Sequence, residues 1–199
     1  WHVEQKPLFT NCFFIECRDK EELKTTLHAS LVPFSILIDG VNYIDTARGY
    51  TVSEEYLGIG LEGIREHFVL ATKSMSRTAE AMAKDIDISL KNLRTDYIDL
   101  YQIHNAPPAD VEKVCAPGGA LEALTAAKKA GKIGHIGITA HSLETFRMAL
   151  ELPWVETIMF PYNIVEDQAK ELIHACAEKN IGFIAMKPLA GGAIEDAVT

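Results

Sequence analysis

The stretch Tyr97-Ile-Asp-Leu-Tyr-Gln-Ile-His104 decides how this chain folds. It is a short run of β-favouring residues that ends on a polar side chain. Comparable runs occur at residues 42–47, 68–73, 133–141, 155–163 and 181–189. These runs are apolar on both faces, which is typical of parallel strands covered by helices on both sides.

The segments between these runs carry helical signals. They are residues 53–65, 78–93, 119–130, a stretch opened by Ser142, and 166–179. In residues 78–93 the apolar positions recur every three or four residues, and Gly131 is a suitable terminator for the helix before it. The alternation predicts successive βα units. A doubly wound sheet and a closed barrel both fit, although no G-x-G-x-x-G follows the first strand, which counts against a Rossmann-type dinucleotide fold.

The two ends of the chain fit this scheme poorly. Residues 20–31 and 34–39 could form short elements, but Pro33 separates them. An eight-unit barrel usually needs about 250 residues, whereas only six strands are clear. We therefore expect one domain over residues 1–199 in which a first and a last strand are missing or disguised.

Composition narrows the class of protein. The chain has 199 residues, 48% of them hydrophobic, and a net charge of −9 with a pI near 5.2. A nucleic-acid partner would need a basic face, so none is expected. No run of about 18 apolar residues could span a membrane. Four cysteines with only one close pair (Cys12 and Cys17) predict neither a metal site nor a disulfide framework, and favour a reducing, cytoplasmic location.

Polar side chains stand where the predicted strands end. Asp45, Lys73, His104, Asn163 and Lys187 all come late in, or directly after, apolar runs. The carboxyl ends of parallel strands lie on one rim, and active sites form on that rim. The sequence therefore predicts an active site there.

Each of these residues also has a structural explanation. Asp45 could cap the next segment, and Lys73 could reach solvent. His104 could be a structural histidine, and Tyr50 could be a packing aromatic. Their occurrence together at adjacent strand ends favours chemistry instead. A free phenol has a pKa near 10, and a neighbouring ammonium favours the phenolate. An aspartate would hold that lysine charged, and a histidine could bind a substrate oxygen. Such a set suits a reaction that places negative charge on a carbonyl oxygen.

Several motifs resemble the aldo/keto reductase family. They are Gly40-Val-Asn-Tyr-Ile-Asp-Thr-Ala-Arg-Gly-Tyr50-Thr-Val-Ser-Glu54, Ala71-Thr72-Lys73, Asp96-Tyr-Ile-Asp-Leu-Tyr-Gln-Ile-His104 and Lys132-Ile-Gly-His-Ile-Gly-Ile-Thr139. The resemblance covers about residues 36–195. It implies a (β/α)8 TIM barrel, incomplete at both ends of this chain, with NADPH as the preferred cofactor and NADH as the other candidate. It also implies that the catalytic residues are Asp45, Tyr50, Lys73 and His104.

The cofactor side departs from the family pattern. Thr51 replaces the usual glycine after the tyrosine, and Thr139-Ala140-His141 replaces a Ser-Asn pair. The run Phe160-Pro161-Tyr162-Asn163 has no glutamine, and Met186 occupies the place of a stacking aromatic. The expected cofactor-binding residues are Thr139, Asn163, Met186, Lys187 and Gly191. The last strands also resemble a microbial subgroup that often carries an iron–sulfur segment, but nothing in this chain could hold a cluster, and no metal is expected.

These observations predict an oxidoreductase that reduces an aldehyde or ketone with NAD(P)H, with Tyr50 as general acid. Two alternatives stay open: a Schiff-base lyase that uses Lys73 or Lys187, and a non-catalytic module that binds a cofactor and regulates a partner. The substrate would be a small carbonyl compound whose identity depends on loops, notably residues 105–118. The sequence does not define the oligomeric state.

Overall fold

A computed structural model describes residues 41–188 and residue 190. Gly191, and the segments 20–31 and 34–39 considered above, lie outside the described residues. Within the described part the strands form one sheet of six parallel strands, in the spatial order in which they occur along the chain. The strands are β1 (Tyr43–Asp45), β2 (Val69–Ser74), β3 (Ile98–Ile103), β4 (Ile133–Thr139), β5 (Thr157–Pro161) and β6 (Gly182–Met186).

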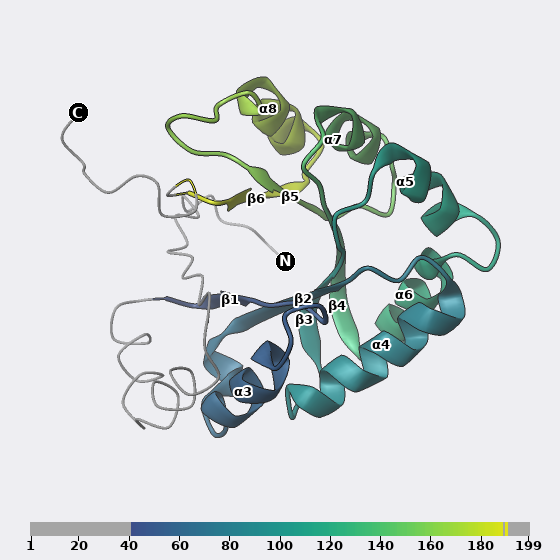
Figure 1. The fold of residues 1–199 in the computed structure, drawn as a ribbon, viewed down its shortest axis with the longest axis vertical. Helices are drawn as coiled ribbons and strands as arrows, with labels where there is room; N and C mark the ends of the chain where they lie inside the picture. The colour runs from purple at the N-terminus through teal and green to yellow at the C-terminus, as the bar shows by residue number, and fades with distance from the viewer. Residues whose placement is uncertain (1–40, 189, 191–199) are drawn as a thin grey trace.

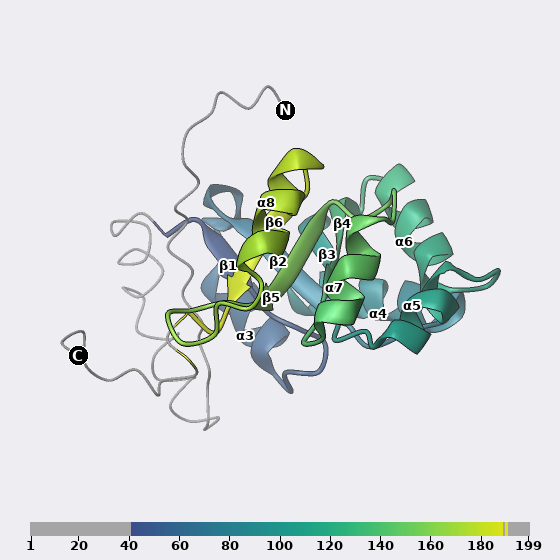
Figure 2. The ribbon, with the colours of Figure 1, turned by 90° about the horizontal axis from the view of Figure 1, so that it is seen from above.

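The sheet curves into an open horseshoe with helices along its convex side (Figure 1). These elements are α3 (Ser53–Gly60), the 3-10 turn η1 (Arg65–His67), α4 (Ala79–Asn92), α5 (Pro108–Cys115), α6 (Ala120–Lys129), α7 (Leu143–Leu150) and α8 (Lys170–Glu178). Seen from above, α7 and α8 lie over β5 and β6 (Figure 2). The Phe146 ring of α7 stacks on Phe183 of β6, with ring centres 5.9 Å apart.

The helices form because each has one apolar face to bury against the sheet. In α4 the buried side chains are Met82, Ile86 and Ser89, which recur at the helical spacing. The hydroxyl of Thr78 caps this helix by accepting from the amide of Ala81 at 3.4 Å. Ser142 caps α7 in the same way. The core therefore lies between the helices and the convex face of the sheet.

The six predicted strands are confirmed, each within a few residues of its expected bounds. The parallel, sequentially ordered, curled sheet is consistent with an incomplete (β/α)8 barrel and confirms the predicted fold class. The stretch 105–118, which the sequence analysis treats as a loop, contains helix α5. Pro107 and Pro108 stiffen the start of α5, and Val111 and Val114 bury its apolar face.

Alternation along the strands separates two sets of side chains. On β2, Thr72 and Ser74 bind side chains of α3 and α4 on the convex side. Lys73, between them, points to the concave side and meets Asp45 of β1. The concave side is therefore where the predicted catalytic residues gather.

Within the described residues no helix is both long and apolar enough to cross a membrane.

Candidate active site

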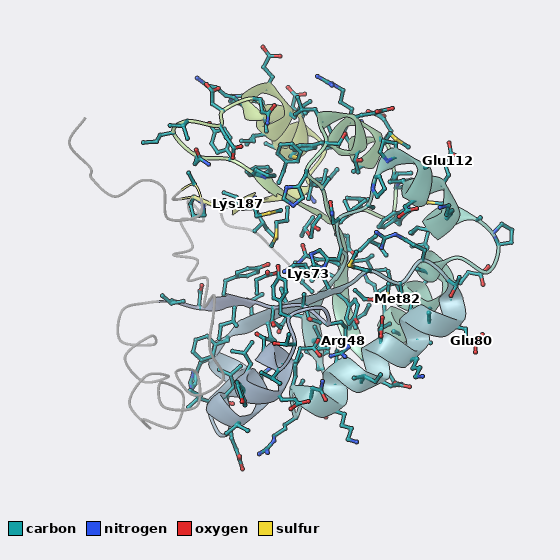
Figure 3. All side chains as sticks on the ribbon, viewed as in Figure 1. Arg48, Lys73, Glu80, Met82, Glu112 and Lys187 are labelled. Atoms are coloured by element: carbon teal, nitrogen blue, oxygen red, sulfur yellow. The ribbon has the colours of Figure 1, made fainter. Side chains whose placement is uncertain are left out.

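A buried ion pair joins the first two strands. The Lys73 ammonium donates to the Asp45 carboxylate and to the backbone carbonyl of Thr46, the latter at 2.9 Å. The two side chains are only 3% and 5% exposed. Figure 3 shows Lys73 on the concave side of the curved sheet. Removing charges from water is costly, so such a pair persists only when its polar groups are well matched.

Gln102 completes the surroundings of Asp45, and the sequence interpretation missed it. The residue lies on β3 beside Lys73 in the strand register, is fully buried, and donates from Nε2 to Asp45 Oδ1 at 3.1 Å. Both carboxylate oxygens thus accept hydrogen bonds, as an ionised carboxylate does. Burial raises the pKa of Asp45, and Lys73 and Gln102 oppose that rise. A polar residue inside an apolar strand, two positions before His104, is the signal that could have revealed it.

Gly137 makes room for that glutamine. It pairs with Gln102 in the register of β3 and β4. A methyl group at this glycine would stand 3.1 Å from Cγ of Gln102 and 2.2 Å from the hydroxyl oxygen of Thr157. The missing side chain therefore lets Gln102 lie across the sheet toward Asp45.

Tyr50 lies directly beside the ion pair. The Lys73 ammonium nitrogen is 4.8 Å from the centre of the Tyr50 ring. The ring also meets His104 edge to face, with centres 5.8 Å apart and planes at 87°. Tyr50 is 44% exposed, so its hydroxyl can reach a substrate while the residues beneath it stay buried. The structure thus brings all four predicted catalytic residues together.

The loop that carries Tyr50 contains a strained position. Thr51 has φ of +46°, in the left-handed region that β-branched residues rarely adopt. This explains physically why a glycine fits the position better, and it shows that Thr51 is accommodated here at some cost.

A second buried network supports the same loop. The carboxylate of Glu54 accepts from Thr72 at 2.9 Å, from Ser89 at 2.7 Å and from Asn92 at 3.3 Å, and it also pairs with Arg48. These contacts tie α3 to β2 and α4, and they fix the residues on both sides of Tyr50. Arg48 is labelled in Figure 3, on the opposite side of the sheet from the concave interior.

His104 follows β3, and its surroundings keep it neutral. Burial lowers its pKa to about 4, helped by the positive charges of Lys73 and Arg77 and by His141. Its Nδ1 is buried and has no hydrogen-bond partner among the described residues. A proton there would be hidden without an acceptor, so the neutral ring with its proton on Nε2 is the form inferred from these contacts.

Four of the predicted cofactor-binding residues lie at the ends of strands β4 to β6 or shortly after them, and the fifth, Gly191, lies outside the described residues. Thr139 is buried and accepts from the amide of Asn105 at 2.8 Å. Met186 is half-buried at the end of β6, and Lys187, which follows it, is exposed. Figure 3 shows Lys187 on the other arm of the horseshoe from Lys73.

Both polar side-chain atoms of Asn163 already form hydrogen bonds within the protein. Its amide nitrogen donates to Glu166 at 3.3 Å and to the backbone carbonyl of Lys187 at 3.1 Å. Its amide oxygen accepts from the backbone of Val165 and Glu166, each at 2.9 Å. Asn163 therefore supports the chain at Lys187. In the described part of the chain, no group of three His, Cys, Asp or Glu side chains could hold a metal ion.

A curled parallel sheet with helices on its convex side and polar residues gathered at its strand ends is typical of the βα-barrel class of proteins. The model of the aldo/keto reductase family matches residues 23–199. The chain belongs to the aldo/keto reductase family.

The chain is also similar to several curated relatives and solved structures. The chain is 35% identical over 162 residues to aldo-keto reductase YhdN of Bacillus subtilis, a match that covers 72% of this chain and 46% of that protein. It is 30% identical over 163 residues to aldo-keto reductase yakc, NADP(+), of Schizosaccharomyces pombe, again with 72% and 46% covered. The structure resembles aldo-keto reductase AKR11C1 from Bacillus halodurans in its holo form, with a TM-score of 0.74, 26% identity, and coverage of 87% of this chain and 59% of that chain. The chain spans about half the length of the curated relatives that it matches.

Proposed function

We propose that this protein reduces the carbonyl group of an aldehyde or ketone with NADPH, using Tyr50 as the proton donor. One observation carries the proposal: a buried ammonium, held by Asp45, lies 4.8 Å from the ring centre of a tyrosine that is itself open to solvent. The active site would lie in a single domain that includes all of residues 1–199.

The contacts of Tyr50 suit proton donation. As the phenol gives up its proton to the carbonyl oxygen, negative charge develops on the phenol oxygen, and the nearby Lys73 ammonium stabilises it. Asp45 and the carbonyl of Thr46 keep that ammonium in place. Because this electrostatic stabilisation is fixed before the reaction, it requires no rearrangement during the proton transfer.

His104 would orient the substrate. The neutral ring with a proton on Nε2 can donate one hydrogen bond to a carbonyl oxygen. Its edge-to-face contact with Tyr50 places the two donors side by side. A carbonyl oxygen held between them would receive a hydrogen bond from each, which favours the developing negative charge.

Met186 at the end of β6 and Lys187 directly after it suit a nicotinamide dinucleotide. Met186 offers a half-buried apolar surface for a flat ring, and the exposed Lys187 offers positive charge for phosphate. Thr139 would contribute its hydroxyl, and Asn163 would hold the backbone at Lys187. Gly191 is proposed near the phosphates from the sequence alone. The cofactor, when bound, supplies the reducing electron pair.

The choice of NADPH has support from a relative. The name of yakc, at 30% identity, includes NADP(+). We extend that cofactor to this chain, with NADH as the weaker candidate. The ion pair argues against a Schiff base at Lys73, because its nitrogen donates to a carboxylate and a carbonyl and would have to leave both before it could attack a substrate.

Fluorescence titration of the intact protein with NADPH and with NADH tests the cofactor. We expect saturable NADPH binding and, in its presence, consumption of NADPH when small aldehydes and ketones are added. Borohydride treatment with a carbonyl compound serves as the counter-test. A stable lysine adduct, or carbonyl turnover that needs no nicotinamide, would contradict the proposal.

A further inference from the structure

The turn that follows β3 holds His104 by its backbone. The His104 amide donates to the carbonyl of Ser74 at 2.8 Å, and the Asn105 amide donates to the hydroxyl of Thr139 at 2.8 Å. Asn105 itself adopts φ of +45°, so the chain reverses sharply at this point. Asparagine adopts this left-handed conformation more readily than most residues, and the two hydrogen bonds fix the turn here.

The side chain of Arg77 also binds the backbone of this turn. Its Nη2 donates to the carbonyl of His104 at 2.8 Å and to the carbonyl of Asn105 at 3.2 Å. Its Nε donates to the carboxylate of Asp110 in α5 at 3.1 Å. The side chain is only 14% exposed. One planar guanidinium therefore links the turn that carries His104 to the helix that follows it.

We propose that Arg77 is a positioning residue of the active site, which holds the His104 turn against Tyr50. This inference rests on the proposed function, because it assigns His104 a role toward the substrate. Arg77 acts through His104 and its backbone, and it need not touch the substrate itself.

Groups from several elements of the sheet act on the His104 ring. Lys73 on β2, Arg77 in the loop after β2 and His141 after β4 all disfavour a positive charge on His104. Tyr50, from the loop after β1, contacts the ring edge to face. Burial is the largest cause of the lowered pKa, and Lys73 is the next. Loss of Arg77 should therefore raise the pKa of His104 from about 4 without restoring 6.5.

Arg65 provides a matched control. It precedes strand β2, whereas Arg77 follows that strand. It donates to the carbonyls of Phe68 and Tyr97, at 2.6 and 3.1 Å, and to the carboxylate of Asp99 at 2.5 Å. Both arginines thus bind two carbonyls and one aspartate, with side chains 20% and 14% exposed. Only Arg77 lies beside His104.

The experiment compares Arg77→Met with Arg65→Met in the intact protein. Histidine ring signals are followed by NMR between pH 4.5 and 8, and the His104 signal is the one that His104→Gln lacks. At pH 5 about a tenth of a histidine with a pKa near 4 is protonated. We expect a clearly larger fraction in Arg77→Met, a wild-type fraction in Arg65→Met, and kcat/KM lowered about tenfold or more only in Arg77→Met, since hydrogen bonds from charged donors contribute on this scale.

Arg77→Lys separates charge from geometry. Lysine keeps the positive charge but cannot bridge two carbonyls and a carboxylate in one plane. We expect the His104 protonation curve of the wild type, with kcat/KM between those of the wild type and Arg77→Met. Circular dichroism confirms that the variants are folded. If Arg77→Met and Arg65→Met titrate alike at His104 and lose activity equally, Arg77 is merely structural and the inference is overturned. The NMR result stands without turnover, so failure of the reductase assignment is distinguishable from failure of this one.

Discussion

The ammonium nitrogen of Lys73 lies 4.8 Å from the centre of the Tyr50 ring, on a lysine side chain that is only 3% exposed. A cation near an aromatic face is attracted by the electrons of the ring, and the attraction grows when the cation is removed from water. The buried lysine therefore holds the exposed tyrosine in place, and it also prepares the site for negative charge on the phenol.

Replacing Tyr50 with phenylalanine removes the proposed proton donor and keeps the ring. We expect carbonyl reduction to fall about 10²- to 10⁴-fold, the usual contribution of a positioned acid. NADPH binding should be nearly unchanged, which fluorescence titration checks. Tyr97, an exposed tyrosine directly before β3, provides the control, and Tyr97→Phe should keep wild-type turnover. Full activity in Tyr50→Phe would remove the assigned acid.

The Asp45–Lys73 pair should behave as one unit in stability measurements. Asp45→Asn or Lys73→Met alone leaves a buried charge without its partner, which costs roughly 3–5 kcal/mol. The double variant should regain part of that stability but none of the activity. Urea unfolding of the four proteins gives the coupling energy. Glu62→Gln breaks the exposed Arg94–Glu62 pair and should cost less than about 1 kcal/mol.

His104 should make the folded protein less stable in mild acid. Its pKa is about 4 when folded and near 6.5 when unfolded, so below pH 6.5 the unfolded chain binds more protons. The stabilisation is complete above pH 6.5 and declines as the pH falls toward 4. Between pH 7 and pH 5 we expect a loss on the order of 1 kcal/mol that His104→Gln does not show. Urea unfolding at both pH values measures it, and equal losses in the two proteins would refute the assignment.

Two adjacent glutamates on α3 should respond very differently to neutralisation. Glu54 is buried and accepts from four side chains, whereas Glu55 is exposed. Glu54→Gln replaces an acceptor by a donor in that network, and we expect a loss of roughly 2–4 kcal/mol together with lower activity, because the Tyr50 loop loses its support. Glu55→Gln should change stability by less than about 0.5 kcal/mol.

The strained residue in the Tyr50 loop offers a stabilising change. Thr51 has φ of +46°, which costs roughly 1–2 kcal/mol for a residue with a side chain. Thr51→Gly should therefore raise the free energy of unfolding by about 1 kcal/mol. The neighbouring Val52 has an ordinary φ of −105°, so Val52→Gly should lower it. The two shifts should have opposite signs in thermal unfolding.

The strands could be predicted from the sequence because burial between two helical layers leaves an almost continuous apolar run. Asp45, Lys73 and His104 could be placed because each ends such a run, and Tyr50 because it follows one in a recognisable motif. All four meet in the structure. Their roles in catalysis stay predictions, as do those of the cofactor residues.

The contacts of Gln102 and Arg77 could not be predicted from the sequence because their partners are distant along the chain. The contact of Gln102 with Asp45 depends on the strand register and on the space at Gly137. The sequence also did not reveal that Asn163 binds its own loop and the backbone of Lys187, because the latter contact joins two different strand ends. Helix α5 was not predicted, although proline is favoured in the first turn of a helix and Pro108 begins this one.

The spatial order of the strands repeats their order along the chain, and this bears on how the molecule is assembled. Each new strand docks on the one made just before it, so only a short loop must be closed at each step. Asp45 and Lys73 lie on the first two described strands, and His104 directly follows the third. As the chain leaves the ribosome, these groups can meet before β6 has been synthesised. The part of the site that holds Asp45, Lys73 and His104 is therefore expected to fold first. Pulse-labelled hydrogen exchange should find the amides of β1–β3 protected before those of later strands.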